Sequence, residues 1–137
     1  MNRRMDRIKL VIVVDDQPSL CSAVGGVLAS AGYAVKTFAS AEELLRNGVG
    51  DAGCVVLDVA LPGMNGFEAH RHLQSASECP RVIFYSGLED PDGRLRTLAL
   101  EAGALAFLQK PFDSDELLEA VTRAWTPRTK RMRRSER

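Results

Sequence analysis

Five short runs of apolar, mostly β-branched residues alternate along this chain with longer segments of helical periodicity. This alternation constrains the fold more than any other feature, because it predicts parallel strands joined by crossover helices. The predicted strands cover residues 9–14, 34–38, 54–59, 81–86 and 106–109. The first and third strands are apolar on both faces, which is typical of strands in the middle of a sheet covered by helices on both sides. We therefore predict an α/β fold, a doubly wound (βα)5 unit.

Several helix boundaries follow from capping residues. Ser40 with Glu43 has the spacing of a capping box before a helix, and residues 113 and 116 repeat that spacing near the end of the chain. Gly32 stands where the first helix should end. Pro91 should open the fourth helix, at a position where its missing N–H costs nothing.

Length and charge indicate one domain with an uneven charge distribution. A chain of 137 residues with 45% hydrophobic residues can bury one core. The formal net charge is zero, but the last ten residues carry +5, so residues 1–127 carry −5. We expect an N-terminal extension over 1–7, one domain over 8–126 and a basic tail or linker over 127–137. A solvated tail or linker is favoured over a weak electrostatic contact with nucleic acid.

The cysteines and the apolar segments bear on the compartment. Cys21, Cys54 and Cys79 are odd in number and have no CxxC spacing, which favours a reducing compartment. The N-terminal segment is basic and then apolar, but the apolar run is too short for a signal peptide and has no cleavage site. No apolar stretch approaches the roughly 20 residues of a membrane helix. We expect a soluble, cytoplasmic protein without membrane contact.

Polar side chains stand at the carboxyl ends of four predicted strands, the edge where open parallel sheets bind ligands. The first strand is followed by Asp15 and Asp16, the third carries Asp58, the fourth ends in Ser86 and the fifth is followed by Lys110. Each residue alone is a weak signal, since an Asp before a helix is usually a cap and a Ser is often a turn former. Their joint placement on one edge predicts a functional site.

The chemistry of this edge favours a metal and a phosphoryl group. Three carboxylates within about 5 Å of one another repel by roughly 3 kcal/mol per pair at an effective dielectric near 20. A hard divalent cation relieves this repulsion, and Mg²⁺ prefers one or two carboxylates together with waters and phosphate oxygens. A central carboxylate can then attack a phosphorus whose oxygens are neutralised by the metal and by Lys110.

Four segments resemble, in this order and spacing, the receiver domain of two-component response regulators, of the CheY-like superfamily. The segments are "VVDDQPS", "VVLDVALPGMNGFE", "FYSG" and "AFLQKPF", and the resemblance covers about residues 8–126. It implies a flavodoxin-like fold with a five-stranded parallel sheet of order 2-1-3-4-5. It also implies that a histidine kinase passes a phosphoryl group to an aspartate of this chain, as in a two-component phosphorelay.

The resemblance implies a role for each acidic residue at the strand ends. Asp58 would be the phosphoacceptor. Asp16 and Asp58 would ligate Mg²⁺ directly, together with the backbone carbonyl of Ala60, and Asp15 would act largely through a water.

The same resemblance extends to the last two strand ends. Lys110 would pair with the phosphoryl oxygens, and Ser86 would donate its hydroxyl to one of them. Phe107 occupies the aromatic switch position of the family, and the Lys110–Pro111 peptide bond corresponds to one that is cis in these domains.

The implied partners lie upstream and downstream of a phosphorylation switch. A sensor histidine kinase or a histidine phosphotransfer protein would donate the phosphoryl group. A downstream protein or a further output domain would read it, and a homodimer would use the face made by the fourth helix, fifth strand and fifth helix. Nucleic acid is not expected to bind the core and would at most contact the basic tail.

Three alternatives belong to other functional classes. A phosphorylation-independent scaffold with the same fold would keep the site but not use it. A haloacid-dehalogenase-like phosphatase needs a second Asp two residues after its nucleophile, where this chain has Ala60. A flavodoxin-like FMN binder needs Ser, Thr and Gly amides in the first loop, where "DDQPS" presents acid. We therefore expect a signalling module without catalytic turnover on an external metabolite.

Two histidines lie close together on the predicted third helix. His70 and His72 are two positions apart and point to different helix faces, so they make a poor metal site. We expect His70 to be a partly buried structural residue.

Overall fold

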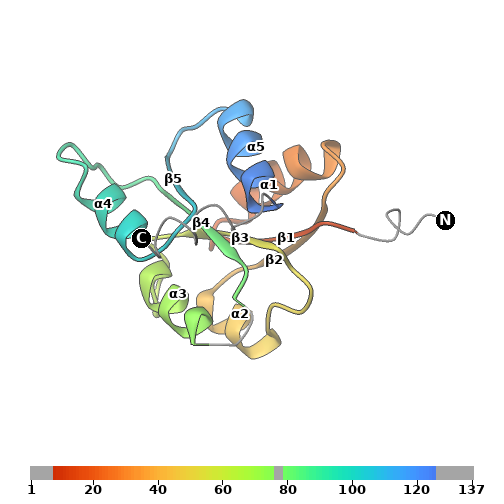
Figure 1. Cartoon of the computed structure of the whole chain (residues 1–137), viewed down its shortest axis with the longest axis horizontal. Coiled ribbons are helices and arrows are strands. Elements are labelled where there is room, and N and C mark those ends of the chain that lie inside the picture. Colours follow the sequence, from red (N-terminus) through yellow and green to blue (C-terminus); the bar gives the residue numbers. More distant parts are fainter. Residues whose placement is uncertain (1–7, 76–78, 126–137) are drawn as a thin grey trace, which may run out of the picture.

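The computed structural model describes residues 8–75 and 79–125, in which five strands alternate with five α-helices (Figure 1). The α-helices are followed by a short 3-10 helix, η2 (Arg123–Trp125). The elements are β1 (Leu10–Val14), α1 (Pro18–Ser30), β2 (Ala34–Phe38), α2 (Ala41–Asn47), β3 (Cys54–Asp58), α3 (Gly66–Gln74), β4 (Arg81–Ser86), α4 (Arg94–Glu101), β5 (Ala106–Gln109) and α5 (Ser114–Thr122). The predicted α/β class is confirmed, and two strand boundaries differ by one residue, at the start of β1 and the end of β3.

The five strands form one parallel sheet in the order β2-β1-β3-β4-β5, as the family resemblance implies. The order reverses between β1 and β3, so the loops after these two strands lie next to each other at one edge. In a doubly wound sheet this is where a ligand site is expected.

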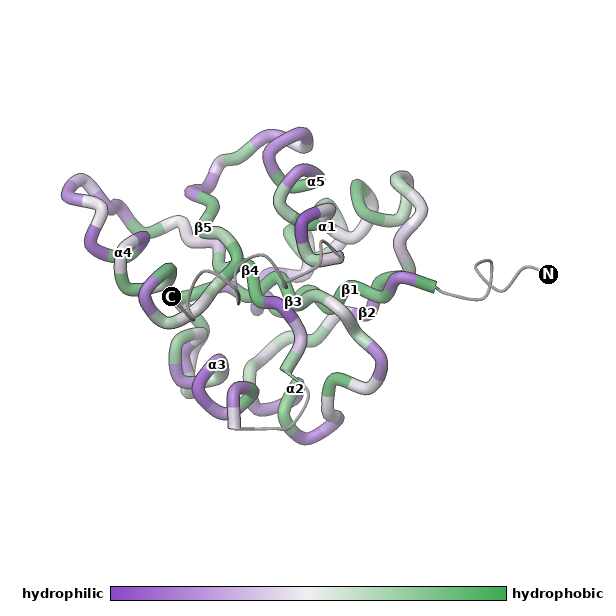
Figure 2. Tube along the Cα trace, in the orientation of Figure 1, coloured by the Kyte–Doolittle hydropathy of each residue, from purple (hydrophilic) through white to green (hydrophobic). Residues whose placement is uncertain are grey.

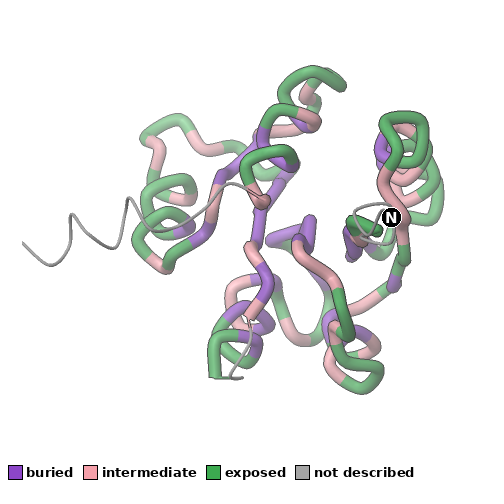
Figure 3. Tube along the Cα trace, turned by 45° about the vertical axis from the view of Figure 1, so that its right-hand side comes forward, coloured by how far each residue is buried: buried purple, intermediate pink, exposed green. Residues whose placement is uncertain are grey.

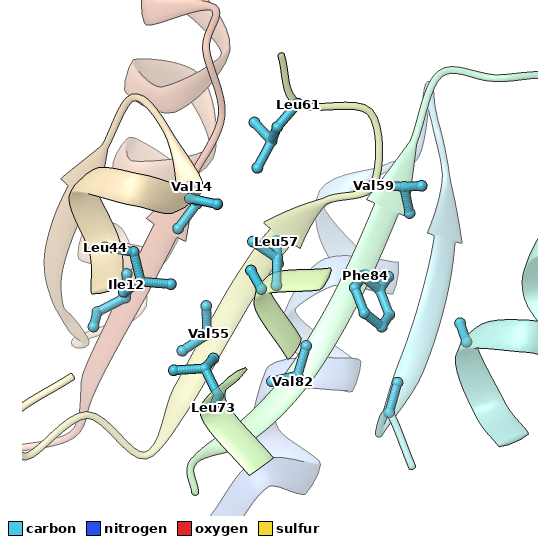
Figure 4. Close-up of a cluster of buried hydrophobic side chains, with 14 of the residues drawn as sticks. Ile12, Val14, Leu44, Val55, Leu57, Val59, Leu61, Leu73, Val82 and Phe84 are labelled. Atoms are coloured by element: carbon cyan, nitrogen blue, oxygen red, sulfur yellow. The ribbon is translucent and has the colours of Figure 1, made fainter. Parts of the chain in front are cut away.

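Two hydrophobic cores lie on opposite faces of the sheet. On one face, Ile12 and Val55 pack with residues of α2, α3 and α4, as Figure 4 shows for part of this cluster. On the other face, Val13 and Val56 pack with residues of α1 and α5. The period of two in the strands directs alternate side chains to alternate faces. Each fully buried Val or Leu stabilises the fold by about 1.5–3 kcal/mol.

Burial and hydropathy follow the same layering. Hydrophobic residues gather along the strands, and hydrophilic residues mark the outer sides of the helices (Figure 2). The central strands β1, β3 and β4 are buried almost throughout (Figure 3). Since backbone groups in such strands pair with neighbours on both sides, the sheet forms a rigid base for residues at its edge.

Two of the predicted helix boundaries are confirmed. Asp113 and Glu116 form a complete capping box at the start of α5. Gly32 follows the end of α1 with a φ of 99°, a conformation that favours glycine. At α2, Ser40 accepts the N–H of Glu43, but the Glu43 carboxylate accepts the N–H of Ala39 rather than of Ser40. The capping box predicted there is therefore only half formed.

The predicted start of the fourth helix at Pro91 is wrong. Helix α4 begins at Arg94, and Asp90 accepts the N–H groups of Leu95 and Arg96 through its two carboxylate oxygens. The Asp90 side chain therefore caps the helix from four residues before its start. Pro91 lies in the turn between this cap and the helix.

The 3-10 helix η2, which follows α5, is anchored at the pole of the sheet opposite the strand ends that carry the acidic residues. Trp125 stacks on Tyr33, with the ring centroids 5.5 Å apart, and the ammonium of Lys9 lies 5.6 Å from the centre of the indole. A Cβ atom at Gly53 would meet the indole at 2.6 Å, so this position has no room for a side chain.

The predicted extension over 1–7 lies outside the described residues, as does all of the predicted tail over 127–137. The proposed domain limits therefore stay predictions. Within residues 8–75 and 79–125, none of the helices combines the length and apolar character that a membrane span requires.

Candidate functional site

Three carboxylates meet where the strand order reverses. Asp15 and Asp16 follow β1, and Asp58 ends the neighbouring strand β3. One oxygen from each of the three can be chosen so that all lie within 4.8 Å of one another. Asp15 and Asp58 are buried, whereas Asp16 is exposed. The set consists of hard oxygen donors with one face open to solvent, which fits Mg²⁺ with part of its water shell retained.

Backbone contacts shape the loops that hold these acids. The N–H of Gln17 donates to Asp15 Oδ1 at 2.9 Å, and the N–H of Ala60 donates to Asp58 Oδ1 at 3.1 Å. Helix α3 starts directly against the end of β3. The approach is so close that a Cβ atom on Gly66 would collide with the carbonyl oxygen of Asp58. The carbonyl of Ala60 belongs to the same loop, two residues after Asp58.

Lys110 bridges two of the carboxylates from the end of β5. Its Nζ lies 3.4 Å from Asp15 Oδ2 and 3.3 Å from Asp58 Oδ2. The Lys110–Pro111 peptide bond is cis, as the resemblance implied. The structure therefore places a cation beside the two buried acids predicted from the strand ends.

Two opposing effects act on the protonation of Asp58. Burial raises the pKa of this carboxyl, and the charge of Asp15 acts in the same direction. The Lys110 ammonium and the Ala60 N–H oppose the rise in pKa, but the balance remains above the ordinary value. A cation bound among the three acids would favour the ionised, nucleophilic form of Asp58.

Ser86 ends β4 at the site's edge of the sheet, whereas Phe107 lies within β5, opposite Phe84 of β4. Ser86 is fully buried, and its Oγ accepts the N–H of Leu88 at 3.0 Å. The Phe107 ring is 3% exposed, and the guanidinium of Arg96 lies 5.3 Å from its centre. Arg96 also donates to the carbonyl of Phe107 at 3.2 Å. The ring is thus already inside the protein, and a switching role for either residue stays a prediction.

Tyr85 belongs to the site but was not predicted from the sequence. Its hydroxyl donates to Asp15 Oδ2 at 2.5 Å, and Lys110 Nζ lies 4.6 Å from the centre of its ring. Burial raises the pKa of Tyr85, and the hydrogen bond to Asp15 raises it further, so the hydroxyl keeps its proton. The available signal was a Tyr that continues the apolar run of β4, since a buried Tyr hydroxyl needs a partner.

A cleft of about 410 Å³ adjoins the carboxylates on the side of α1 and α2, and Asp15, Asp16, Cys21 and Glu43 are among its lining residues. Cys21 Sγ donates to the carbonyl of Asp15 at 3.3 Å, and burial raises the pKa of this thiol. The cleft leaves the exposed carboxylate of Asp16 accessible from solvent.

Comparison with known proteins gives a consistent picture. The family model for the response regulator receiver domain matches residues 11–122. The response regulator protein TodT of Pseudomonas putida is 35% identical over 120 residues, which cover 87% of this chain and 52% of TodT. The transcriptional regulatory protein FixJ of Azorhizobium caulinodans is 37% identical over 112 residues, which cover 81% of this chain and 52% of FixJ. The chain thus spans about half the length of these curated relatives.

Solved structures show the same similarity. The BeF3-activated receiver domain of DrrB, a Thermotoga maritima protein, aligns with a TM-score of 0.78 at 32% identity. That alignment covers 88% of this chain and 100% of the DrrB domain. A response regulator receiver domain protein from Clostridium thermocellum aligns with a TM-score of 0.80 at 26% identity, over 91% of this chain and 99% of the other.

Proposed function

Because this chain belongs to the response regulator receiver family, we propose that it is a phosphorylation-switched receiver domain that accepts a phosphoryl group on Asp58. The observation that carries the proposal is the position of this carboxylate. It ends a central strand, lies within 4.8 Å of two further acids and is 3.3 Å from the ammonium of Lys110. A carboxylate in such surroundings is suited to nucleophilic attack on phosphorus.

In the proposed reaction a carboxylate oxygen of Asp58 attacks the phosphorus of a phosphohistidine on a donor protein. The new O–P bond forms as the N–P bond breaks, and the imidazole leaves with the electron pair of the broken bond. As negative charge passes from the Asp58 carboxylate to the phosphoryl group, the Lys110 ammonium would exchange its contact with a carboxylate oxygen of Asp58 for one with a phosphoryl oxygen. The product is an acyl phosphate on Asp58.

The acid cluster would hold Mg²⁺ through Asp16, Asp58 and the carbonyl of Ala60. When bound, this ion would neutralise phosphoryl oxygens and orient them towards the carboxylate. Asp15 would act through a water, because its Oδ1 already accepts from Gln17 and its Oδ2 from Tyr85 and Lys110. Asp16 is exposed and can offer its carboxylate directly.

Signal output would pass through Ser86 and Phe107 to the face formed by α4, β5 and α5. A phosphoryl oxygen would accept a hydrogen bond from the Ser86 hydroxyl and alter the loop that follows β4. We propose that this chain is cytoplasmic and that a sensor histidine kinase or a histidine phosphotransfer protein is the donor. Since the chain spans about half of its curated relatives, an output domain or a separate downstream protein would read the signal, and the α4-β5-α5 face would mediate a homodimer.

The experiment is phosphorylation by a small donor. Incubated with Mg²⁺ and acetyl phosphate, the protein should gain one acid-stable, base-labile phosphoryl group, detected by intact mass spectrometry. Asp58→Asn should abolish the gain, since the amide is a far weaker nucleophile, and chelation of the metal should prevent it in the wild type. Asp51→Asn, at an exposed position before β3, is the matched control and should be labelled like the wild type.

Three outcomes would redirect the assignment. Equal labelling of Asp58→Asn would show that another residue is the acceptor. A folded wild type that binds Mg²⁺ but takes no label from acetyl phosphate or from histidine kinases would favour the scaffold. Metal-dependent release of phosphate from small esters, without a labelled protein, would favour the phosphatase.

A further inference from the structure

Tyr85 is fixed next to the proposed phosphoacceptor by the sheet itself. It lies on β4 directly opposite Asp58 of β3 in the strand register, and its carbonyl accepts the N–H of Val59 at 3.0 Å. The side chain is 0% exposed and points to the face covered by α1 and α5. Its ring meets Phe112 edge-on, with the centroids 5.7 Å apart. The position of the phenol is therefore determined by packing on all sides.

The hydroxyl of Tyr85 makes the shortest contact to the Asp15 carboxylate. Its distance of 2.5 Å to Oδ2 is typical of a hydroxyl that donates to an ionised acid. Lys110 Nζ approaches the same oxygen at 3.4 Å, and Oδ1 accepts the N–H of Gln17. The side chain of Asp15 is fully buried, so its carboxylate oxygens depend on these donors for their hydrogen bonds.

The ring of Tyr85 contacts the second partner of Asp15. Lys110 Nζ lies 4.6 Å from the ring centre, within the range of a cation–π interaction. The same ammonium lies between Oδ2 of Asp15 and Oδ2 of Asp58, at nearly equal distances from both. One buried side chain therefore contacts an acid and the ammonium that this acid shares with Asp58.

We propose that Tyr85 is a positioning residue that keeps Asp15 out of direct metal coordination and leaves Lys110 available to Asp58. Without the hydroxyl, Oδ2 of Asp15 would lose its closest donor. The acid would then draw Lys110 towards itself and away from Asp58, and the acceptor position on Oδ2 that the hydroxyl vacated would ligate a cation directly. Metal affinity should rise while phosphoryl acceptance falls, a pair of opposite changes that a loss of folding cannot produce. The part that concerns phosphoryl acceptance rests on the proposed function.

The test is Tyr85→Phe, which keeps the ring and removes only the hydroxyl. Isothermal titration with Mg²⁺ alone should give a Kd several-fold lower than that of the wild type. At saturating Mg²⁺, the rate of labelling by acetyl phosphate should be several-fold slower. Tyr33→Phe is the matched control, because its hydroxyl lies 3.5 Å from Thr122 Oγ1 near the other pole, and both values should match the wild type. On an Asp15→Asn background, Tyr85→Phe should change the Kd much less than it does alone.

Unchanged or weaker Mg²⁺ binding in a folded Tyr85→Phe variant would overturn the proposal. If the variant does not fold, the wild type labelled with 3-fluorotyrosine gives the answer. Its Tyr85 signal should shift on addition of Mg²⁺ while the Tyr33 signal stays in place, and an unshifted Tyr85 signal would equally overturn the proposal. A wild type that binds Mg²⁺ but accepts no phosphoryl group would contradict the proposed function, while the Mg²⁺ affinities would still decide the role of Tyr85.

Discussion

His70 is a titratable side chain enclosed by apolar neighbours on the inner side of α3. It is 3% exposed, and its ring meets Phe84 edge-on with the centroids 5.3 Å apart. Burial lowers the pKa of His70 below its ordinary value of 6.5. The expected structural role agrees with this position, although the residue is more fully buried than its sequence context indicated.

The buried imidazole should make stability depend on pH. Because the folded pKa lies below the unfolded value, neutral His70 contributes stability that is present above the unfolded pKa. That stability is lost as the pH falls through the folded pKa. His70→Leu should therefore show a smaller fall in the free energy of unfolding than the wild type between about pH 7 and about pH 5. Urea denaturation at both pH values measures this change in the free energy of unfolding. His72→Gln, on the exposed side of α3, is the control for a lost imidazole. Equal falls in the wild type and His70→Leu would contradict the expectation.

At this scale the sequence predicted residues whose position follows from topology alone. Asp15, Asp58 and Lys110 come together because they lie at or directly after the ends of strands of one parallel sheet, and strand ends can be predicted from the hydrophobic pattern. Tyr85 could not be found in this way. Its contact with Asp15 joins residues 70 positions apart and depends on which face of β4 the ring occupies, a matter of side-chain packing.

At the scale of an element, the start of α4 depends on one side chain that lies outside the N-cap position. The N-cap position is Gly93, with a φ of 72° and no side chain to accept a hydrogen bond. Asp90 supplies the two acceptor oxygens instead. Pro91 was a misleading local signal, because the loop conformation that lets Asp90 reach the first turn cannot be deduced from helix propensity. The same first turn carries Arg96, which packs on Phe107.

Removal of this cap should loosen the first turn of α4. Asp90→Ala should lower the free energy of unfolding by about 1 kcal/mol, the usual cost of losing an acidic cap. Amide hydrogen exchange at Leu95 and Arg96 should become faster. Asp92→Ala removes an exposed acid from the turn that precedes α4 and should cost much less stability. If both variants lose equal stability, the effect is one of loop charge and not of capping.

At the scale of the whole molecule, the loop after β4 connects the site to the α4-β5-α5 face. Gln109 of β5 donates through its Nε2 to the carbonyls of Ser86 and Leu88, at 3.1 and 2.7 Å. A movement of this loop must therefore strain or break contacts to β5. These two hydrogen bonds join the loop after β4 to β5, the route that the proposed signal would take.

Beryllofluoride, which mimics a phosphoryl group, should act through this connection. With Mg²⁺ present, it should change amide hydrogen exchange in residues 86–90, in α4 and in β5, and leave α2 largely unaffected. Hydrogen exchange with mass spectrometry detects the change, and Asp58→Asn should show none. A response confined to α2 would mean that the signal leaves the site by another route.

The overall architecture could be predicted from the sequence better than the first and last residues of the domain. Alternating strands and helices indicated the α/β class directly, whereas the strand order came from the resemblance, because crossover connections of similar length permit several orders. The ends of the domain depended on composition alone, which distinguishes a folded segment from a charged tail only approximately.

The docking of Trp125 has a spectroscopic consequence. This indole is the one tryptophan in the sequence, and it lies against Gly53 at the start of β3, whereas Asp58 ends that strand. A strand rises about 3.3 Å per residue, so Gly53, against which the indole packs, lies roughly 16 Å from the proposed phosphoacceptor along β3. The emission of Trp125 therefore monitors how η2 packs on the opposite pole. Ligand binding at the acid cluster is better followed with a probe introduced there. The native fluorescence can then be used independently to measure global unfolding.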